Sequence, residues 1–181
     1  MAAALPSTNP RGIPATKFIE SVADFLKDEE SADAALKKMN EAYGTYKYLE
    51  EKLAAKKQSL KKKIPEMKKT REAVLHLLSQ KAEGKEIQAQ FELSDHVYTN
   101  ATISGPENVC LWLGANVMVE YPIEDALAVL EGNLATAQEH LGQVTEDLQF
   151  LKAQITTVEV NIARVFNHDV KARRRAREAG Q

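Results

Sequence analysis

The stretch VCLWLGANVMVEY, residues 109–121, decides how this chain folds. Its first five residues are apolar without a break, and apolar residues return at alternate positions from Val117 to Tyr121. Between the two runs, Gly-Ala-Asn at 114–116 favours a tight turn. The stretch therefore predicts a β-hairpin, and we expect its first strand, residues 109–113, to be buried on both faces.

A second predicted hairpin precedes the first. Phe91 and Leu93 alternate with polar residues, and the segment 97–103 is rich in β-branched side chains, which favour strands. Ser-Gly-Pro at 104–106 is a turn signal that separates the two hairpins. Residues 85–121 are therefore expected to form a compact β unit of two hairpins.

This β unit is expected to drive oligomerisation. Four short strands cannot cover both faces of an apolar central strand, and an exposed apolar row invites aggregation unless it is paired. We therefore expect the unit to pair with β-strands of other subunits. The residues expected at that interface are Phe91, Leu93, Val97, Ile103, Val109, Leu111, Trp112, Leu113, Val117 and Val119.

Long helices are predicted on both sides of the β unit. From Ile123 to Val165, apolar residues follow one another in steps of four and three, the repeat of a coiled coil. This repeat predicts a helix over 122–176. A weaker repeat predicts a helix over 31–84, with a kink or a lost hydrogen bond at Pro65. The fold class is thus mainly α: a long antiparallel two-helix coiled coil with two β-hairpins at one end.

The ends of the chain carry less pattern. Residues 1–30 are expected to be an N-terminal extension with a short amphipathic helix, because Phe18, Ile19, Val22, Phe25 and Leu26 have helical spacing. That helix either packs on the assembly, acts as a tethered recognition helix or stays mobile. Residues 177–181 are expected to form a tail.

Composition excludes several classes of protein. No run approaches the ~18 apolar residues that cross a membrane, and the single cysteine, Cys110, is expected to be a packed thiol of a reducing cytosol. The four histidines are widely spaced, without a metal-binding or catalytic motif. We therefore expect no enzyme activity, no cofactor and no metal.

The order helix, two hairpins, helix resembles the α-type subunits of prefoldin. The motif at 109–121 is similar to the last two strands of such subunits. Arg-Gly-Ile-Pro at 11–14 is similar to their N-terminal extension, and residues 156–165 are similar to their last coil. The resemblance covers residues 11–172. It implies a hexamer of two α-type and four β-type subunits, whose hairpins form a β-barrel platform. It also implies that, without ATP, the coiled-coil tips capture unfolded actin and tubulin for the cytosolic chaperonin.

The resemblance places candidate client-binding residues near the free helix ends. These are Tyr43, Tyr46, Tyr48, Ile162, Val165 and Phe166. Residues on the heptad seam are alternatively packed against each other. Tyr48 and Phe166 fall off the seam and are therefore the preferred candidates for client contact.

Basic residues concentrate at 56–69 and at the C-terminal end, although the formal net charge is only −2. The C-terminal cluster comprises Lys171, Arg173, Arg174, Arg175 and Arg177. It is interpreted either as a helix end whose cations complement the dipole or as a contact for an acidic chaperonin, an acidic client or a nuclear-import receptor. A nuclear presence beside the cytoplasmic one is therefore left open.

Two other functions remain as alternatives. The chain is alternatively a structural coiled-coil scaffold or tether without client binding. A rod that binds nucleic acid or microtubules is less favoured, because the heptad seam runs through the basic stretch instead of starting after it. The β unit favours the chaperone, since a tether needs no apolar platform.

Overall fold

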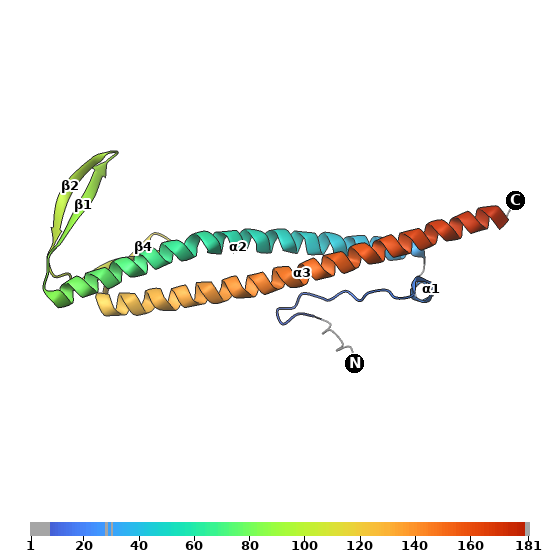
Figure 1. Cartoon of the computed structure of the whole chain (residues 1–181), viewed down its shortest axis with the longest axis horizontal. Coiled ribbons are helices and arrows are strands. Elements are labelled where there is room, and N and C mark those ends of the chain that lie inside the picture. Colours follow the sequence, from blue (N-terminus) through green and yellow to red (C-terminus); the bar gives the residue numbers. More distant parts are fainter. Residues whose placement is uncertain (1–7, 28, 30, 180–181) are drawn as a thin grey trace. The chain divides into compact units, whose positions relative to one another are not determined.

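The computed structural model describes residues 8–27, 29 and 31–179 of the chain. Residues 1–7, 28 and 30 of the expected extension, and residues 180–181 of the expected tail, lie outside this part. The elements are α1 (Val22–Phe25), α2 (Ala32–Glu83), β1 (Ile87–Ser94), β2 (Val97–Ile103), β3 (Asn108–Gly114), β4 (Val117–Pro122) and α3 (Ile123–Ala179) (Figure 1). The predicted fold class, mainly helical with two antiparallel hairpins, is confirmed.

Helix α2 begins and ends at residues that cap it. The Ser31 hydroxyl accepts a hydrogen bond from the Ala34 amide at 3.1 Å, which satisfies a free amide of the first turn. At the other end Gly84 has a φ of 65°, and the Lys85 amide donates to the Gln80 carbonyl at 3.1 Å. The helix continues through Pro65.

Helix α3 has different bounds from those expected. Pro122 is the last residue of β4, where it pairs with Asn108, so the helix begins at Ile123 rather than at the proline. It extends to Ala179 instead of ending at 176. An ion pair between Arg174 and Glu178, 3.0 Å long and one turn apart, supports this additional turn.

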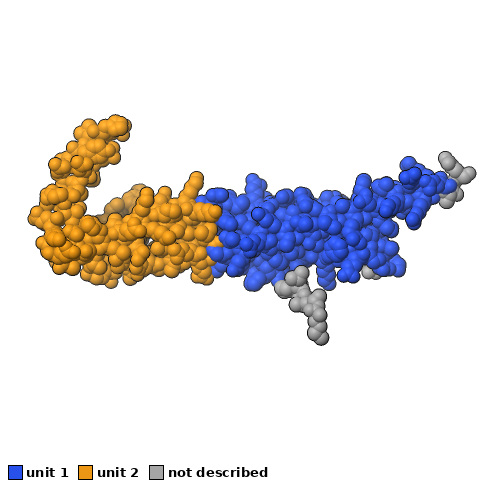
Figure 2. Space-filling model, in the orientation of Figure 1, with its two compact units in different colours: residues 1–58, 142–181 blue, residues 59–141 orange. Residues whose placement is uncertain are grey.

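The chain divides into two compact units, which are described separately (Figure 2). Unit 1 combines Met1–Gln58 with Gly142–Gln181, and unit 2 is Ser59–Leu141. In unit 1 the helices run antiparallel, since Tyr43 bonds to Glu159 while the earlier Asp33 bonds to the later Arg173.

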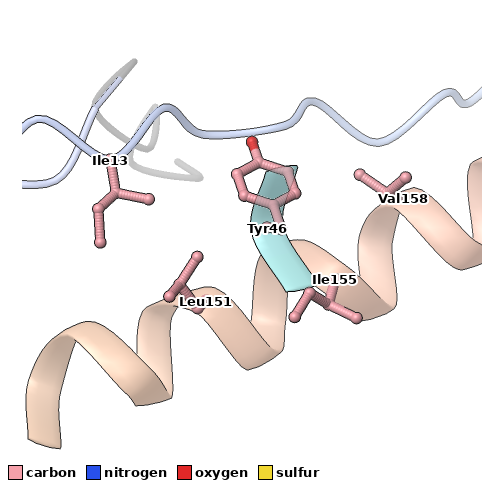
Figure 3. Packing of buried hydrophobic residues seen from close by; sticks show 5 residues of the cluster. All are labelled: Ile13, Tyr46, Leu151, Ile155 and Val158. Atoms are coloured by element: carbon pink, nitrogen blue, oxygen red, sulfur yellow. The ribbon is translucent and has the colours of Figure 1, made fainter. Parts of the chain in front are cut away.

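The core of unit 1 is built from three segments. Leu151, Ile155 and Val158 of α3 pack with Tyr46 of α2 and with Ile13 of the N-terminal segment (Figure 3). A second cluster joins Ile19 and Val22 of the N-terminal segment to Val165 of α3. The N-terminal segment therefore completes the core of this unit by packing on α2 and α3 of the same chain. Packing was one of the three alternatives for the extension.

The amphipathic helix expected at 18–26 is much shorter than its pattern predicted. Only Val22–Phe25 is helical, and Ile19 is buried from an extended segment before the helix. Phe18 remains exposed, with the Arg164 guanidinium 5.1 Å from its ring centroid. Contacts with α3 thus decide the conformation of residues whose spacing alone favours a helix.

In unit 2 the four strands form two separate two-stranded sheets. In β3 only Leu111 is buried, and Trp112 and Leu113 are more than half exposed. The expectation that 109–113 is buried on both faces was therefore wrong for the chain by itself, as was the expectation of a packed Cys110, which is exposed. A two-stranded ribbon lacks the neighbours that would cover it.

The turn between β3 and β4 matches its sequence signal. Ala115 and Asn116 both have positive φ angles, of 48° and 60°. Positive φ at both central residues is the geometry of a tight two-residue hairpin turn.

Two valines of α3 test the packing of unit 1. We expect Val158→Ala to lower the free energy of unfolding by about 1.5–3 kcal/mol, because Val158 is fully buried. Val160→Ala is the matched control, since Val160 is exposed on the same helix and gains the same helix propensity. Urea unfolding followed by circular dichroism measures both, and equal effects of the two substitutions would contradict the described core.

Candidate functional site

A row of buried polar side chains marks one face of α3 in unit 1. Asp147, Gln154 and Asn161 follow one another at intervals of seven residues, and each is at most 6 % exposed. A seven-residue interval is close to two helical turns, so the three side chains share one face. We call them the polar row. All three bond to residues 9–21, which we call the strap.

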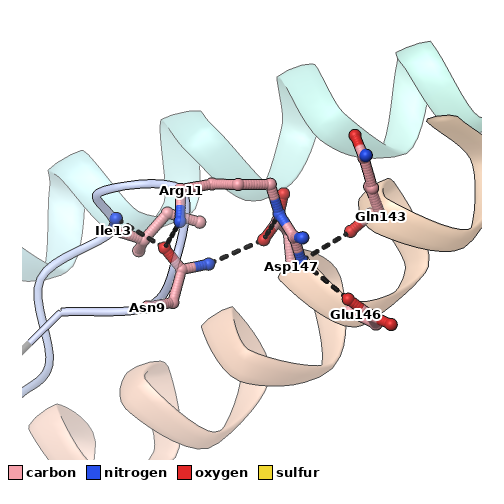
Figure 4. A network of polar contacts seen from close by, with 6 residues as sticks. All are labelled: Asn9, Arg11, Ile13, Gln143, Glu146 and Asp147. Atoms are coloured by element: carbon pink, nitrogen blue, oxygen red, sulfur yellow. Dashed lines mark hydrogen bonds and ion pairs between the residues drawn. The ribbon is translucent and has the colours of Figure 1, made fainter. Parts of the chain in front are cut away.

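Asp147 anchors the start of the strap (Figure 4). Its carboxylate accepts hydrogen bonds from the side-chain Nδ2 of Asn9 at 2.6 Å and from Nε of Arg11 at 2.7 Å. The Arg11 guanidinium also bonds to Glu146 at 3.0 Å and to the Gln143 carbonyl at 3.2 Å. A buried carboxylate is thereby paired with a cation, which offsets the cost of its desolvation.

These carboxylates raise the pKa of Arg11, mainly through the hydrogen bond to Asp147 and then through that to Glu146. A raised pKa means that this contribution to stability is fully present below the arginine's ordinary pKa and is lost only in strong alkali. Arg11 therefore stays charged at physiological pH. Its exposed partner Glu146 makes part of the anchor sensitive to salt.

Asn9 also closes a tight turn at the same place. Its side-chain oxygen accepts hydrogen bonds from the amides of Arg11 and Ile13, at 3.0 and 2.8 Å. Gly12 within this turn has a φ of 83°, a conformation that other residues rarely adopt. The turn directs the Ile13 side chain into the core.

Beyond the turn, side chains of α2 and α3 bind the backbone of the strap. The Thr16 amide donates to Gln154 at 2.7 Å, and the Ile19 amide donates to Asn161 at 3.0 Å. The Asn161 amide group in turn donates to the Lys17 carbonyl at 2.8 Å. Two further donors reach strap carbonyls: Tyr46 bonds to Pro14 at 2.9 Å, and Arg164 bonds to Glu20 at 2.8 Å.

The spacing of the strap matches the repeat of α3. The side chains that face the helices are those of Ile13, Thr16 and Ile19 in the strap and of Val22, the first residue of α1, at every third position. Three residues of extended chain advance about 10 Å, and seven residues of helix rise about 10.5 Å. The heptad from Gln154 to Asn161 therefore meets the three-residue step from Thr16 to Ile19 of a strap that runs in the same direction. The preceding heptad, from Asp147 to Gln154, meets a longer stretch of the strap, from Arg11 to Thr16, which includes part of the turn.

The strap does not fill the space beneath it. A cavity of about 490 Å³ lies between strap residues 16–21, α2 and α3. Met39 and Ala42 of α2 and Val158 of α3 line it together with Phe25, so its wall is largely apolar. The groove that holds the strap thus has room for larger side chains.

The structure separates the candidate client-binding residues into three groups. Tyr46 and Val165 are buried, at 4 % and 0 % exposure, in the clusters that the N-terminal segment completes. Tyr43 and Ile162 are half-buried. Tyr48 and Phe166 are 56 % and 55 % exposed. The two residues that fall off the heptad seam are thus the freely accessible ones.

The residues expected at the subunit interface lie on both ribbons of unit 2. Leu111 is buried, and Val109 and Val119 are half-buried. The remainder are exposed in this chain: Phe91, Leu93, Val97, Ile103, Trp112, Leu113 and Val117. Tyr98 and Met118 are equally exposed beside them and were missed by the sequence analysis, although both occupy predicted strands.

The basic cluster lies on the last turns of α3 and is exposed. Arg173 bonds to Asp169 and to Asp33, and these carboxylates raise its pKa, chiefly through the hydrogen bond to Asp169. Arg174 pairs with Glu178. For Lys171, Arg175 and Arg177 the structure gives an exposed helical position.

The strap and the polar row were not recognised in the sequence. Two signals could have revealed them: the three-residue period of apolar and hydroxyl side chains from Ile13 to Val22, and the seven-residue period of polar residues beside the apolar seam of α3. Within the described residues, no group of histidine, cysteine and acidic side chains could hold a metal ion. No helix of that part has the length and apolar character needed to span a membrane.

Comparison with known proteins assigns the family. A family model described as "Prefoldin subunit" matches residues 46–168. Prefoldin subunit 3 of Mus musculus is 48 % identical over 164 residues, which cover 90 % of this chain and 84 % of that protein. Prefoldin subunit 3 of Saccharomyces cerevisiae is 38 % identical over 180 residues, covering 94 % of this chain and 90 % of that protein.

A solved structure supports the fold. A chain of filamentous PFD from Methanocaldococcus jannaschii, determined by cryo-EM, superposes with a TM-score of 0.50 at 21 % identity, covering 67 % of this chain and 98 % of that chain. The strap lies outside the segment matched by the family model. The motifs at 109–121, 11–14 and 156–165 resemble subunit 3 in particular, in agreement with the relatives. Subunits of this kind are components of a co-chaperone and not enzymes, and the chain belongs to the prefoldin family.

Proposed function

We propose that the chain is one subunit of a hetero-oligomeric co-chaperone that holds non-native polypeptides without using ATP. Its partners in this proposal are other prefoldin subunits, two α-type and four β-type in total. Its clients are unfolded actin and tubulin, which the complex passes to the cytosolic chaperonin. The observation that carries the proposal is the pair of apolar ribbons that the chain itself leaves uncovered.

The ribbons support assembly with other subunits. Each is a two-stranded sheet with free edges, and their exposed side chains include Phe91, Trp112 and Val117. Edges and apolar faces of this kind are stable only when neighbouring strands pair with them. A platform formed with the strands of five other subunits would satisfy both requirements.

The helix ends of unit 1 support client contact. Tyr48 and Phe166 present aromatic surface that the chain does not use for its own packing. The Lys52 ammonium lies 4.4 Å from the centroid of the Tyr48 ring, which gives this surface a positive edge. Such a mixed apolar and cationic surface suits unfolded segments of acidic proteins such as tubulin.

The basic cluster extends the proposal to the chaperonin. Lys171, Arg175 and Arg177 lie on the terminal turns of α3 and are exposed, while Arg173 and Arg174 pair with carboxylates of this chain. We assign the cluster to an acidic surface of the chaperonin or of the client, in the cytosol.

Removal of the exposed aromatic side chains tests client contact. We expect the double variant Tyr48→Ser and Phe166→Ser, reconstituted with partner subunits, to suppress the aggregation of diluted, guanidinium-unfolded actin several-fold less well than the unmodified complex, because aromatic contacts dominate apolar recognition. Light scattering measures the aggregation. The matched control is Tyr48→Phe with Phe166→Leu, which keeps the apolar surface; unchanged suppression by the serine variant would contradict the assignment.

Substitution in the ribbons tests assembly. We expect Trp112→Ser with Val117→Ser to prevent formation of the six-subunit complex, because polar side chains remove the apolar burial that pairing provides. Mass photometry of the mixed subunits measures the complex. The control is the double variant Tyr48→Ser with Phe166→Ser, which should form the complete complex. A complete complex with the ribbon variant would exclude these ribbons as the interface, and a stable two-chain rod would favour the structural tether.

A further inference from the structure

We propose that the groove of unit 1 is a binding site for extended polypeptide segments, and that the strap occupies this site in place of a client. The groove comprises the polar row of α3, the facing side of α2 and the cavity between them. The inference rests on the proposed client-holding function and specifies a site for it. It assigns to residues 9–21 the role of a displaceable, built-in competitor.

Along residues 14–20 the groove mainly binds the backbone of the strap, whereas Asp147 binds the side chains of Asn9 and Arg11. Gln154 and Asn161 bond to the amides of Thr16 and Ile19 at 2.7 and 3.0 Å, and Asn161 also binds the Lys17 carbonyl. Tyr46 and Arg164 bind two more strap carbonyls. Every extended polypeptide offers the same amides and carbonyls, so these five contacts are available to a client of unrelated sequence.

The side-chain requirement of the groove is similarly general. It takes apolar groups at intervals of three residues, as Ile13, Ile19 and Val22 show. The cavity of about 490 Å³ beneath the strap provides space for side chains larger than those of the strap. A segment that carries leucine or aromatic residues at such intervals would fill more of the groove than the strap does.

These two requirements select non-native chains. A folded protein pairs nearly all of its backbone amides and carbonyls and buries its apolar residues. An unfolded chain presents free backbone and apolar side chains together. The groove is therefore selective for conformation while it tolerates many sequences, which is the selectivity that a holding chaperone needs.

The strap is attached in a way that permits exchange. It is covalently tethered, so its effective concentration at the groove is about millimolar, and this adds to the contacts of Arg11, Ile13 and Ile19 in keeping the groove closed. Two of its side chains, those of Lys17 and Phe18, are exposed and leave the groove free for other side chains. A client that fills the cavity can therefore replace it segment by segment.

A labelled peptide tests the site directly. The probe is a fluorescent synthetic peptide of residues 8–26, and the protein is the complex reconstituted with partner subunits. In the strap-released variant, Ile13→Ser with Ile19→Ser and Val22→Ser, the full chain is retained but its strap no longer competes. We expect the peptide to bind the strap-released complex at least tenfold more tightly than the unmodified complex, measured by fluorescence anisotropy.

Matched substitutions locate the binding. Added to the strap-released variant, Gln154→Ala with Asn161→Ala should weaken peptide binding about tenfold, which corresponds to about 1.4 kcal/mol. Gln149→Ala with Asn40→Ala is the control, because both side chains are exposed, and it should leave the affinity unchanged. Circular dichroism and mass photometry check that all variants fold and assemble.

Guanidinium-unfolded actin then distinguishes the possible failures. If the proposal holds, unfolded actin displaces the peptide, and the strap-released complex suppresses actin aggregation better than the unmodified one. If both complexes suppress aggregation equally and the peptide is not displaced, the groove is structural and this inference is overturned, although the chaperone function stands. If neither complex suppresses aggregation, the proposed function itself fails. A strap-released variant that does not assemble would overturn the view of the strap as displaceable.

Discussion

The seven-residue repeat of α3 is the constraint on which the rest of unit 1 depends. Its apolar positions, among them Leu151 and Val158, pack against α2 and close the core. Each residue of its polar row directly precedes an apolar seam residue in the sequence, and the row faces the strap. Because both rows share one period, a single helix holds two partners at once. The burial of the row is compatible with stability because every buried side-chain nitrogen and oxygen in the described residues has a hydrogen-bond partner.

Unit 2 differs from unit 1, because its strand edges are unpaired and many of its apolar side chains are uncovered within this chain. Two ribbons of two strands each expose Phe91, Trp112 and their neighbours, and Cys110 is exposed with them. A chain built in this way is suited to assembly. The same molecule therefore combines a unit that covers its own groove with a unit that depends on neighbours for cover, and both properties are consistent with a prefoldin subunit.

Local patterns in the sequence predicted the elements, and contacts between distant residues decided the rest. The heptads from Ile123 to Val165 and the alternation around Ala115 are signals within short windows, so the helices and hairpins were predictable. The strap joins residues that are about 140 positions apart, such as Ile19 and Asn161, and its three-residue period is weak beside a competing helical pattern. The heptad seam allowed the burial of Tyr46 as an alternative, but the part of Ile13 in the cluster around it was not predictable, for the same reason. The exposure of Trp112 agrees with the prediction that four short strands cannot cover their own apolar faces, although the two-stranded ribbons leave more side chains uncovered than the expected compact unit.

Hydrogen–deuterium exchange of the strap amides in the assembled complex tests the central claim most directly. The amides of Thr16 and Ile19 are bonded to Gln154 and Asn161, so the account predicts slow exchange at both positions in the free complex. When unfolded actin is bound, the account predicts fast exchange at the same two amides, because the client takes over their partners. Unchanged or slower exchange of these amides in the presence of the client would contradict it.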